Sequence, residues 1–203
     1  MKIRQFLPFF SYIFHPIFIS LYGTLFYFLI TPTNLYKNQV YLTIIQVSIL
    51  TLLLPLALYF LMISLGYINS FTEATIKERR IPIFIQILLF FTLIKFSISL
   101  DYLPELYFFF AGGFISAILA LLSVLLKYKA SLHMIGICSL AAFVYAINLH
   151  YQLPYINSVA FFIVCIGLVA SSRLHMNSHT FNELLVGGFI GTLPQVVLWY
   201  FWL

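Results

Sequence analysis

The residues best suited to chemistry lie in one polar stretch, SRLHMNSHTFNE, which runs from Ser172 to Glu183 between two long apolar runs. The stretch contains Arg173, His175, His179 and Glu183. Ionisable groups are costly within or at the edge of membrane-spanning segments, and where they occur they usually have a function. This stretch is therefore the first candidate for a functional site.

The spacing within this stretch favours chemistry on a phosphate group. His179 and Glu183 are four residues apart, so a helix would place them on one face. A carboxylate beside an imidazole fixes its tautomer and leaves the other ring nitrogen as a base, a nucleophile or a ligand. The planar guanidinium of Arg173 is suited to phosphate.

Two other interpretations of the same residues stay open. His175, His179 and Glu183, with His133 as a possible fourth ligand, could bind a metal if the helix began early enough. Asn177-Ser178 predicts a helix start, however, which leaves His175 outside that helix and weakens the metal interpretation. The stretch could also be only a polar loop that caps a membrane helix.

Composition predicts the fold class. The chain has 203 residues, of which 63% are hydrophobic and 7% charged, whereas about a quarter of the residues in soluble domains are charged. Several apolar runs reach the roughly 20 residues that cross a bilayer. We expect an all-α, polytopic transmembrane bundle of about six to seven spans, forming a single domain over 1–203. The net charge of +5 concerns loops and orientation, and it does not indicate nucleic-acid binding.

The apolar runs place seven expected spans, at residues 6–30, 41–65, 83–100, 106–126, 130–149, 158–171 and 184–203. His15-Pro16 falls inside the first span, where the residues predict a kink with a packed histidine. Gly187 and Gly191 form a small-xxx-small face on the last span, which predicts close packing against another helix.

Two further segments carry groups that suit phosphate. The loop before the third span contains Lys77, Arg79 and Arg80, and the fifth span opens with Ser131 and His133. A serine at a helix start is a good N-cap, which explains Ser131 but not His133. The segments after spans two, four and six emerge on the same side of the membrane, so these residues are expected to share a side with the Ser172 to Glu183 stretch.

Taken together, the three segments resemble the signatures of the type 2 phosphatidic acid phosphatase (PAP2) superfamily, in the same order. Ser172-Arg173-x5-His179-x3-Glu183 resembles the third signature, Ser-Arg-x5-His-x3-Asp, with Glu in place of Asp. Ala130-Ser131-Leu132-His133 is similar to the second, Pro-Ser-Gly-His, at its serine and histidine. The basic loop before Pro82 is similar to the first, Lys-x6-Arg-Pro, in place and content but not in spacing.

The resemblance implies a PAP2-like core and a lipid phosphatase that needs no metal or other cofactor. By analogy with the family, His179 attacks phosphorus to form a phosphohistidine, Glu183 orients it, and His133 protonates the leaving alcohol. The implied phosphate-binding residues are Arg173, Ser131, Lys77, Arg79 and Arg80. The implied partners are membrane lipids and a lipid phosphate. Phosphatidate, phosphatidylglycerophosphate and polyprenyl pyrophosphate all qualify, and the sequence does not choose among them or indicate an oligomeric state.

Three other classes of function stay open beside the phosphatase. They are a metal-dependent membrane hydrolase, a degenerate PAP2-like protein that binds a lipid phosphate without turnover, and a transporter or scaffold without enzymatic function.

Orientation is open as well, in an integral membrane protein expected in a bacterial cytoplasmic membrane. Lys2, Arg4, Lys127 and Lys129 lie on the side of the motifs, and Lys or Arg in short loops favours the cytoplasm. Loop charge therefore predicts a site facing the cytoplasm and a carboxyl terminus outside. The habit of the resembled family predicts an external site.

Overall fold

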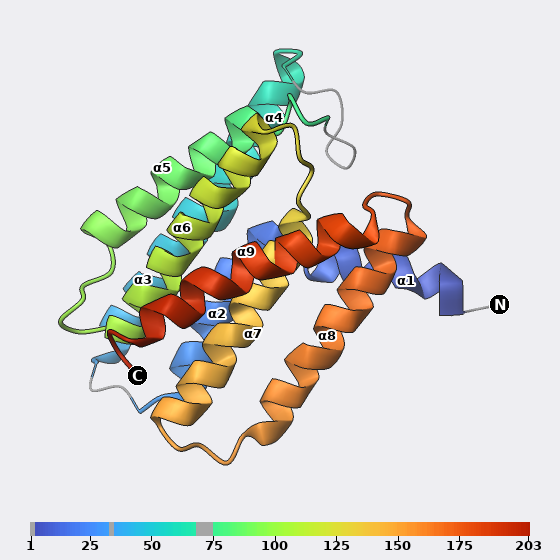
Figure 1. The fold of residues 1–203 in the computed structure, drawn as a ribbon. Helices are drawn as coiled ribbons and strands as arrows, with labels where there is room; N and C mark the ends of the chain where they lie inside the picture. Colours follow the sequence, from blue (N-terminus) through green and yellow to red (C-terminus); the bar gives the residue numbers. More distant parts are fainter. Residues whose placement is uncertain (1–2, 33–34, 68–74) are drawn as a thin grey trace.

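The apolar runs of the sequence fold into helices that lie side by side (Figure 1). The computed structural model describes residues 3–32, 35–67 and 75–203, and no strand occurs among them. Lys2 lies outside these residues. The elements are α1 (Ile3–Ile13), α2 (Pro16–Ile30), α3 (Lys37–Ser48), the π-helix η1 (Ile49–Leu53), α4 (Leu54–Ser64), α5 (Arg80–Phe96), α6 (Pro104–Leu125), α7 (Leu132–His150), α8 (Ile156–His175) and α9 (Phe181–Trp199). The predicted all-α class is confirmed.

Five helical segments of the described chain are long and apolar enough to cross a membrane. They are Lys37–Ser64, Pro104–Leu125, Leu132–His150, Ile156–His175 and Phe181–Trp199, and α1 with α2 makes a sixth if that bent pair is one span. These lengths are compatible with an integral membrane protein. The third expected span corresponds to α5, whose 17 residues lie at the short end of the range for a crossing helix.

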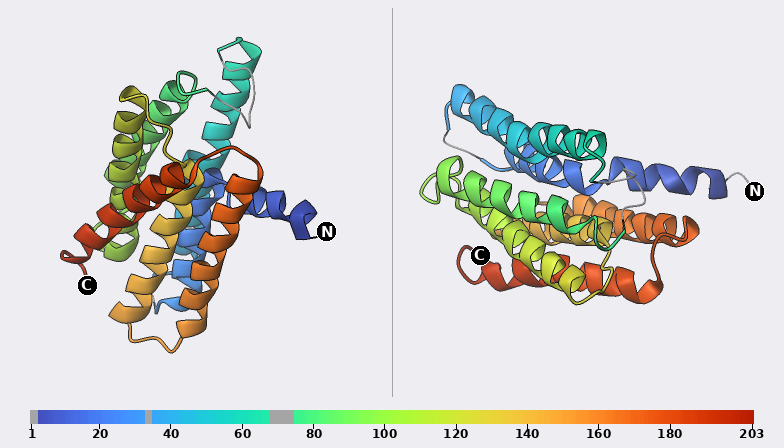
Figure 2. Two further views of the ribbon diagram at one scale, coloured as in Figure 1. Left: turned by 45° about the vertical axis from the view of Figure 1, so that its right-hand side comes forward. Right: turned by 90° about the horizontal axis from the view of Figure 1, so that it is seen from above.

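The first expected span is not one continuous helix. It breaks between Ile13 and Pro16, and the axes of α1 and α2 differ by 65° (Figure 2). Proline suits the first turn of a helix, where its missing N–H would have no partner, so Pro16 starts α2 and His15 becomes its N-cap. The bend lets α1 pack against α8, where the hydroxyls of Ser11 and Ser172 are 2.6 Å apart.

The second expected span is continuous and contains a π-turn. Lys37–Ser64 forms one stretch of 28 residues, in which the N–H of Leu54 donates to the carbonyl of Ile49. Pro55 follows directly. Widening the turn before a proline relieves the clash between its ring and the carbonyl of the preceding turn, so the helix continues past Pro55.

α7 is the most enclosed of the candidate spans, and α9 crosses it at close range (Figure 1). A Cβ added at Gly191 would collide with the carbonyl of Ile135, and one added at Gly187 would lie 2.6 Å from the carbonyl oxygen of Ser131. The close packing predicted from the two glycines is confirmed, and α7 is the partner.

The end of the bundle at which α6 starts is held by a buried carboxylate. Glu105, in the first turn of α6, accepts hydrogen bonds from the hydroxyls of Tyr27 (3.0 Å) and Tyr151. The contact joins α2, α6 and α7 at this end. The polar residues of the three sequence motifs gather at the opposite end, where α5, α7 and α9 begin.

Candidate active site

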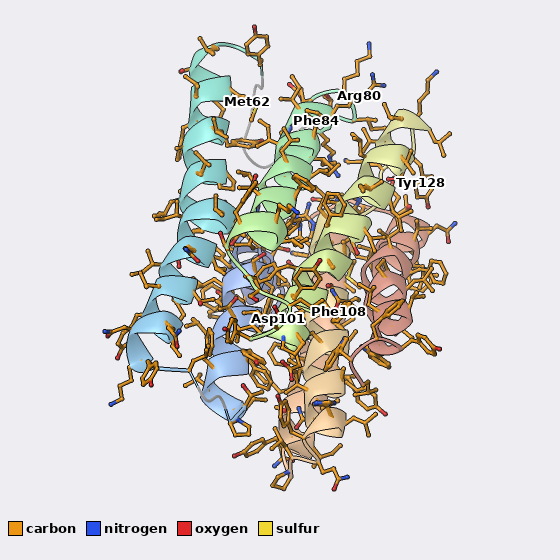
Figure 3. The ribbon with its side chains drawn as sticks, turned by 90° about the vertical axis from the view of Figure 1, so that its left-hand side faces the viewer. Met62, Arg80, Phe84, Asp101, Phe108 and Tyr128 are labelled. Atoms are coloured by element: carbon orange, nitrogen blue, oxygen red, sulfur yellow. The ribbon has the colours of Figure 1, made fainter. Side chains whose placement is uncertain are left out.

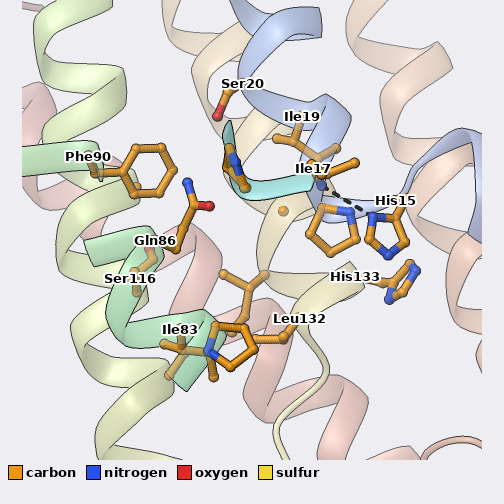
Figure 4. A pocket seen from close by; sticks show the side chains of 18 of the residues that line it. His15, Ile17, Ile19, Ser20, Ile83, Gln86, Phe90, Ser116, Leu132 and His133 are labelled. Carbon is orange, nitrogen blue, oxygen red and sulfur yellow. Dashed lines mark hydrogen bonds between the residues drawn. The ribbon is translucent and has the colours of Figure 1, made fainter. Parts of the chain in front are cut away.

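A cavity of about 280 Å³ opens between the helices (Figure 4). Residues from all three sequence motifs line it. Arg79, His133, Arg173 and His179 line it, and so does His15. These side chains come from four separate segments of the chain, because Arg173 and His179 share the Ser172 to Glu183 stretch. The rest of the lining is mainly apolar and is contributed by α2, α4, α5, α6 and α7.

His179 and Glu183 form a hydrogen-bonded pair, with 3.0 Å between Nδ1 and Oε2. The expected helix start at Asn177-Ser178 is wrong, because α9 begins at Phe181 with Thr180 as its N-cap. His179 therefore precedes the helix, and the two residues do not share a helical face. Glu183 reaches back as the acidic member of a capping box, in which Oε2 also accepts the N–H of Thr180 at 3.0 Å.

The surroundings of His179 keep its imidazole neutral. Burial, followed by the positive charge of Arg79, lowers the pKa of His179 to about 4, although the hydrogen bond to Glu183 acts in the opposite direction. A carboxylate only accepts hydrogen bonds, so Nδ1 carries the proton and donates it to Glu183. The lone pair on Nε2 is then available at neutral pH for nucleophilic attack.

Arg173 is a buried cation without a carboxylate partner in the part of the chain that the structure describes. It lies in the last turn of α8, which extends beyond the expected sixth span, and it is only 6% exposed. Among the described residues, its Nε has no hydrogen-bond partner, and its Nη1 makes a weak hydrogen bond to the sulfur of Met176, at 3.9 Å. A buried charge without a partner is costly, so this position suits an anionic ligand.

Of the three cations predicted in the basic loop, the structure places only Arg79 at the cavity. Arg79 is the N-cap of α5 and is partly buried. Lys77 and Arg80 are exposed and do not line the cavity, and Figure 3 shows Arg80 at the solvent-facing start of α5. Glu73, in the same loop, lies outside the described residues.

Ser131 and His133 have different environments. Ser131 occupies the N-cap position of α7, but its side chain makes no capping bond, so the capping interpretation is wrong in that respect. Its buried hydroxyl has no partner among the described residues and does not line the cavity, while its N–H donates to the carbonyl of Glu183 at 3.2 Å. The link ties the start of α7 to α9.

His133 faces the cavity with a defined tautomer. Its Nε2 lies 3.1 Å from the carbonyl oxygen of Ser11. Because a carbonyl only accepts, Nε2 carries a proton, and Nδ1 is the nitrogen that can exchange one with a ligand. The α1–α2 bend thus contributes directly to the site, since it brings Ser11 to this histidine.

Sequence reasoning missed His15 as a member of the site. Its ring lies 5.1 Å from that of His133, centroid to centroid, in an edge-to-face arrangement, and it lines the same cavity. Its Nδ1 accepts the N–H of Ile17 at 3.4 Å. The sequence contained one signal for this role: His15 directly precedes Pro16, and a proline can mark the first turn of a helix as well as a kink within one.

The structure does not assemble the metal ligands that the sequence allowed. His175 is exposed at the end of α8. Across the described part of the chain, no three His, Cys, Asp or Glu side chains gather closely enough to hold a metal ion. The set of His175, His179 and Glu183, with or without His133, is therefore not brought together.

A second, polar hollow of about 350 Å³ lies on the other side of His179. Its lining consists of Lys129, Asn177, Ser178, His179, Thr180 and Glu183. His179 thus borders both the apolar cavity and a polar hollow lined by the loop before α9.

Comparison with known proteins gives no relative: no family model, no curated protein and no solved structure matches this chain. The likeness to PAP2 enzymes therefore rests on the motif residues and enters below only as a proposal.

Proposed function

We propose that this protein is a membrane-embedded phosphatase that hydrolyses the phosphate monoester or pyrophosphate of a lipid through a phosphohistidine intermediate. The observation that carries the proposal is the His179–Glu183 pair at the edge of a cavity that also holds Arg79, Arg173 and His133. A neutral nucleophile, two cations and a second histidine are the groups that metal-free phosphoryl transfer needs.

In the proposed first step, Nε2 of His179 attacks phosphorus and the bond from phosphorus to the leaving oxygen breaks. The carboxylate of Glu183 stabilises the positive charge that develops on the imidazole. His133 is neutral at Nδ1 in the empty site, so the monoanionic phosphate head supplies the proton: it passes to Nδ1 of His133 on binding and from there to the leaving oxygen. Arg79 and Arg173 stabilise the charge on the equatorial oxygens, as fixed cations do in phosphoryl transfer.

In the second step, water attacks phosphorus and the bond from phosphorus to nitrogen breaks, which releases phosphate and restores His179. His133, now neutral, accepts the proton of the attacking water at Nδ1. The polar hollow beside His179 supports this step, because it gives water and phosphate a route that does not pass through the apolar cavity.

The apolar lining of the cavity supports a lipid substrate. Its walls include Pro55, Leu58, Met62, Ile83 and Phe110. A phosphate head bound among the cations would leave its hydrocarbon tail against these side chains, removed from water. The proposal requires no metal, because the arginines supply the positive charge.

A second candidate is a protein that binds lipid phosphate without turnover. It is favoured by the positions of Ser131, Lys77 and Arg80, three residues of the resembled signatures that do not line the cavity. Such a protein would retain the affinity supplied by Arg79 and Arg173 and would release no phosphate.

The deciding experiment is phosphate release by the purified protein in mixed micelles. The substrate panel contains phosphatidate, phosphatidylglycerophosphate and a polyprenyl pyrophosphate, each with and without EDTA. Turnover of at least one lipid that persists in EDTA is expected. Binding without phosphate release identifies the non-catalytic alternative, and loss of turnover in EDTA contradicts metal-free chemistry. Rapid quenching with a ³²P-labelled substrate should trap an acid-labile label on the protein.

A further inference from the structure

Two polar side chains point into the apolar part of the cavity without hydrogen-bond partners among the described residues. Gln86 extends from α5 and Ser20 lies on α2, and both line the cavity away from the histidines (Figure 4). Neither the Gln86 amide nor the Ser20 hydroxyl makes a hydrogen bond to any residue that the structure describes. A polar group left unpaired in an apolar environment is costly, which points to a ligand that pairs with it.

Neighbouring serines in the same cavity provide a contrast. Ser116 donates to the carbonyl of Ile190 at 2.9 Å, and Ser139 accepts from Gln195 at 2.8 Å. Those hydroxyls serve contacts between helices. Gln86 and Ser20 have no such role, so their polar atoms remain available to whatever fills the cavity.

The depth of these two residues can be estimated along their helices. Ser20 follows His15 by five residues on α2, and Gln86 follows Arg79 by seven on α5. With a rise of about 1.5 Å per residue, Gln86 lies roughly 10 Å along α5 from Arg79. Ser20 lies roughly 8 Å along α2 from His15, whose ring is beside that of His133. The side chains around them, among them Ile19, Ile83 and Phe90, are apolar.

We propose that Gln86 and Ser20 bind the ester linkage of a glycerolipid phosphate, an inference that rests on the proposed function. In such a lipid the ester carbonyls lie a few bonds from the phosphate, and the Gln86 amide and Ser20 hydroxyl donate hydrogen bonds to them. A polyprenyl phosphate presents only hydrocarbon at that depth and leaves both groups unpaired. Gln86 thereby determines specificity for phosphatidate-like substrates over polyprenyl ones.

The test compares Gln86→Met with wild type on three monophosphates in mixed micelles: dioleoyl phosphatidate, its ether-linked analogue without carbonyls, and farnesyl phosphate. Gln86→Met keeps the length of the side chain and removes its hydrogen bonds. We expect wild type to prefer the diester, and the variant to lose about tenfold in kcat/KM on that substrate alone. Gln46→Met is the control, because Gln46 is exposed on α3 and does not line the cavity.

Two outcomes would overturn the inference. One is equal kcat/KM of wild type for the diester and farnesyl phosphate, and the other is an equal loss by Gln86→Met on all three lipids. If wild type releases no phosphate from any lipid, the proposed function fails, and thermal unfolding with each lipid still decides the inference. The diester must then raise the Tm of wild type more than the ether lipid does, and Gln86→Met must remove that difference.

Discussion

His179 is held by neighbours that define its protonation. Glu183 takes the proton of Nδ1, while burial and Arg79 keep a second proton off the ring. Nε2 is therefore an unprotonated nitrogen beside two cations. At the scale of single residues, this is the arrangement that a nucleophile for phosphorus requires, because the ring stays reactive while the surroundings attract the anion.

The first prediction concerns this nucleophile. His179→Ala is expected to abolish phosphate release, because it removes the imidazole whose Nδ1 donates to Glu183 and whose Nε2 is the attacking nitrogen. The measurement is turnover of the best lipid substrate by folded protein. His175→Ala is the matched control, since His175 is four residues earlier and exposed outside the cavity. Retention of more than a few per cent of turnover in His179→Ala rules out covalent catalysis by this residue.

A second prediction addresses Glu183. The amide of Glu183→Gln still accepts hydrogen bonds from His179 and from the N–H of Thr180, so the start of α9 is preserved. It carries no charge to stabilise the imidazolium that forms during attack, and the expected loss in kcat is about a hundredfold or more, as for other orienting carboxylates. Unchanged kcat with an unchanged Tm would contradict the proposed role of the carboxylate.

The third prediction follows from the lowered pKa of His179. The folded protein keeps this ring neutral down to about pH 4, whereas an unfolded chain protonates it near 6.5. The unfolded state thus binds more protons between these values, so His179 makes the free energy of unfolding fall as the pH drops through this window. The acidic limb of kcat/KM is expected near pH 4.

Imidazole ¹⁵N NMR in detergent provides the direct measurement. The His179 resonance is identified by its absence in His179→Ala, and its titration midpoint is compared with that of exposed His175. A midpoint near 6.5 for His179 would contradict the effect of burial and Arg79.

Sequence reasoning predicted the His179–Glu183 pair but assigned it to the wrong geometry. Thr180-x-x-Glu183 is a capping box, and its start signal was outweighed by Asn177-Ser178 three residues earlier. Spacing could not distinguish Arg79 from Lys77 and Arg80, because adjacent residues point in different directions once a helix begins. His15 was missed because a bend between helices depends on tertiary packing.

At the scale of elements, the site is built from helix ends. His15 precedes α2, Arg79 precedes α5, His133 lies in the first turn of α7, and His179 lies just before α9. Helix N-termini carry a partial positive charge, which favours an anion among them. Arg173, from the last turn of α8, adds a full charge. The helices converge in this way only if α7 and α9 cross closely.

The fourth prediction tests that crossing. Gly191→Ala places a methyl group against the backbone of Ile135, which cannot rotate away as a side chain would. Overpacking of this kind costs about 1–3 kcal/mol, so the Tm in detergent should fall by several degrees, and turnover should fall with it. Gly167→Ala is the control, because a Cβ there meets nothing within 4 Å. Equal Tm values for the two variants would contradict the close crossing.

At the scale of the whole molecule, the sequence predicted which segments share a side even though details of the spans differed. The expected first span is bent, α5 is shorter than expected and α8 is longer. The motif residues Arg79, His133 and His179 nevertheless line one cavity, although they come from three separate loops or helix starts. The burial of Glu105 could not be predicted from the sequence, because the two tyrosines that donate hydrogen bonds to its carboxylate come from distant segments.

The last prediction is the orientation of this molecule in the membrane. α6 runs from one end of the bundle to the other. Tyr102, just before α6, and Tyr128, just after it, therefore lie at opposite ends. Outside the cavity, the end that carries the site has Lys77, Arg80, Lys127 and Lys129, and the other end has Lys37 and Lys95. Excess Lys and Arg in short loops favours the cytoplasmic side. We therefore expect the site to face the cytoplasm, against the external habit of the family that the motifs resemble.

Single cysteines at these two tyrosines measure the orientation directly, in a variant in which the buried Cys138 and Cys165 are replaced by alanine. Both tyrosines are exposed, so a cysteine at either position is accessible from its own side. A membrane-impermeant maleimide added to intact cells should label Tyr102→Cys and not Tyr128→Cys, and permeabilised cells should show both. The reverse pattern in intact cells would place the site outside. It would also mean that the basic residues around the cavity serve the ligand, with little influence on topology.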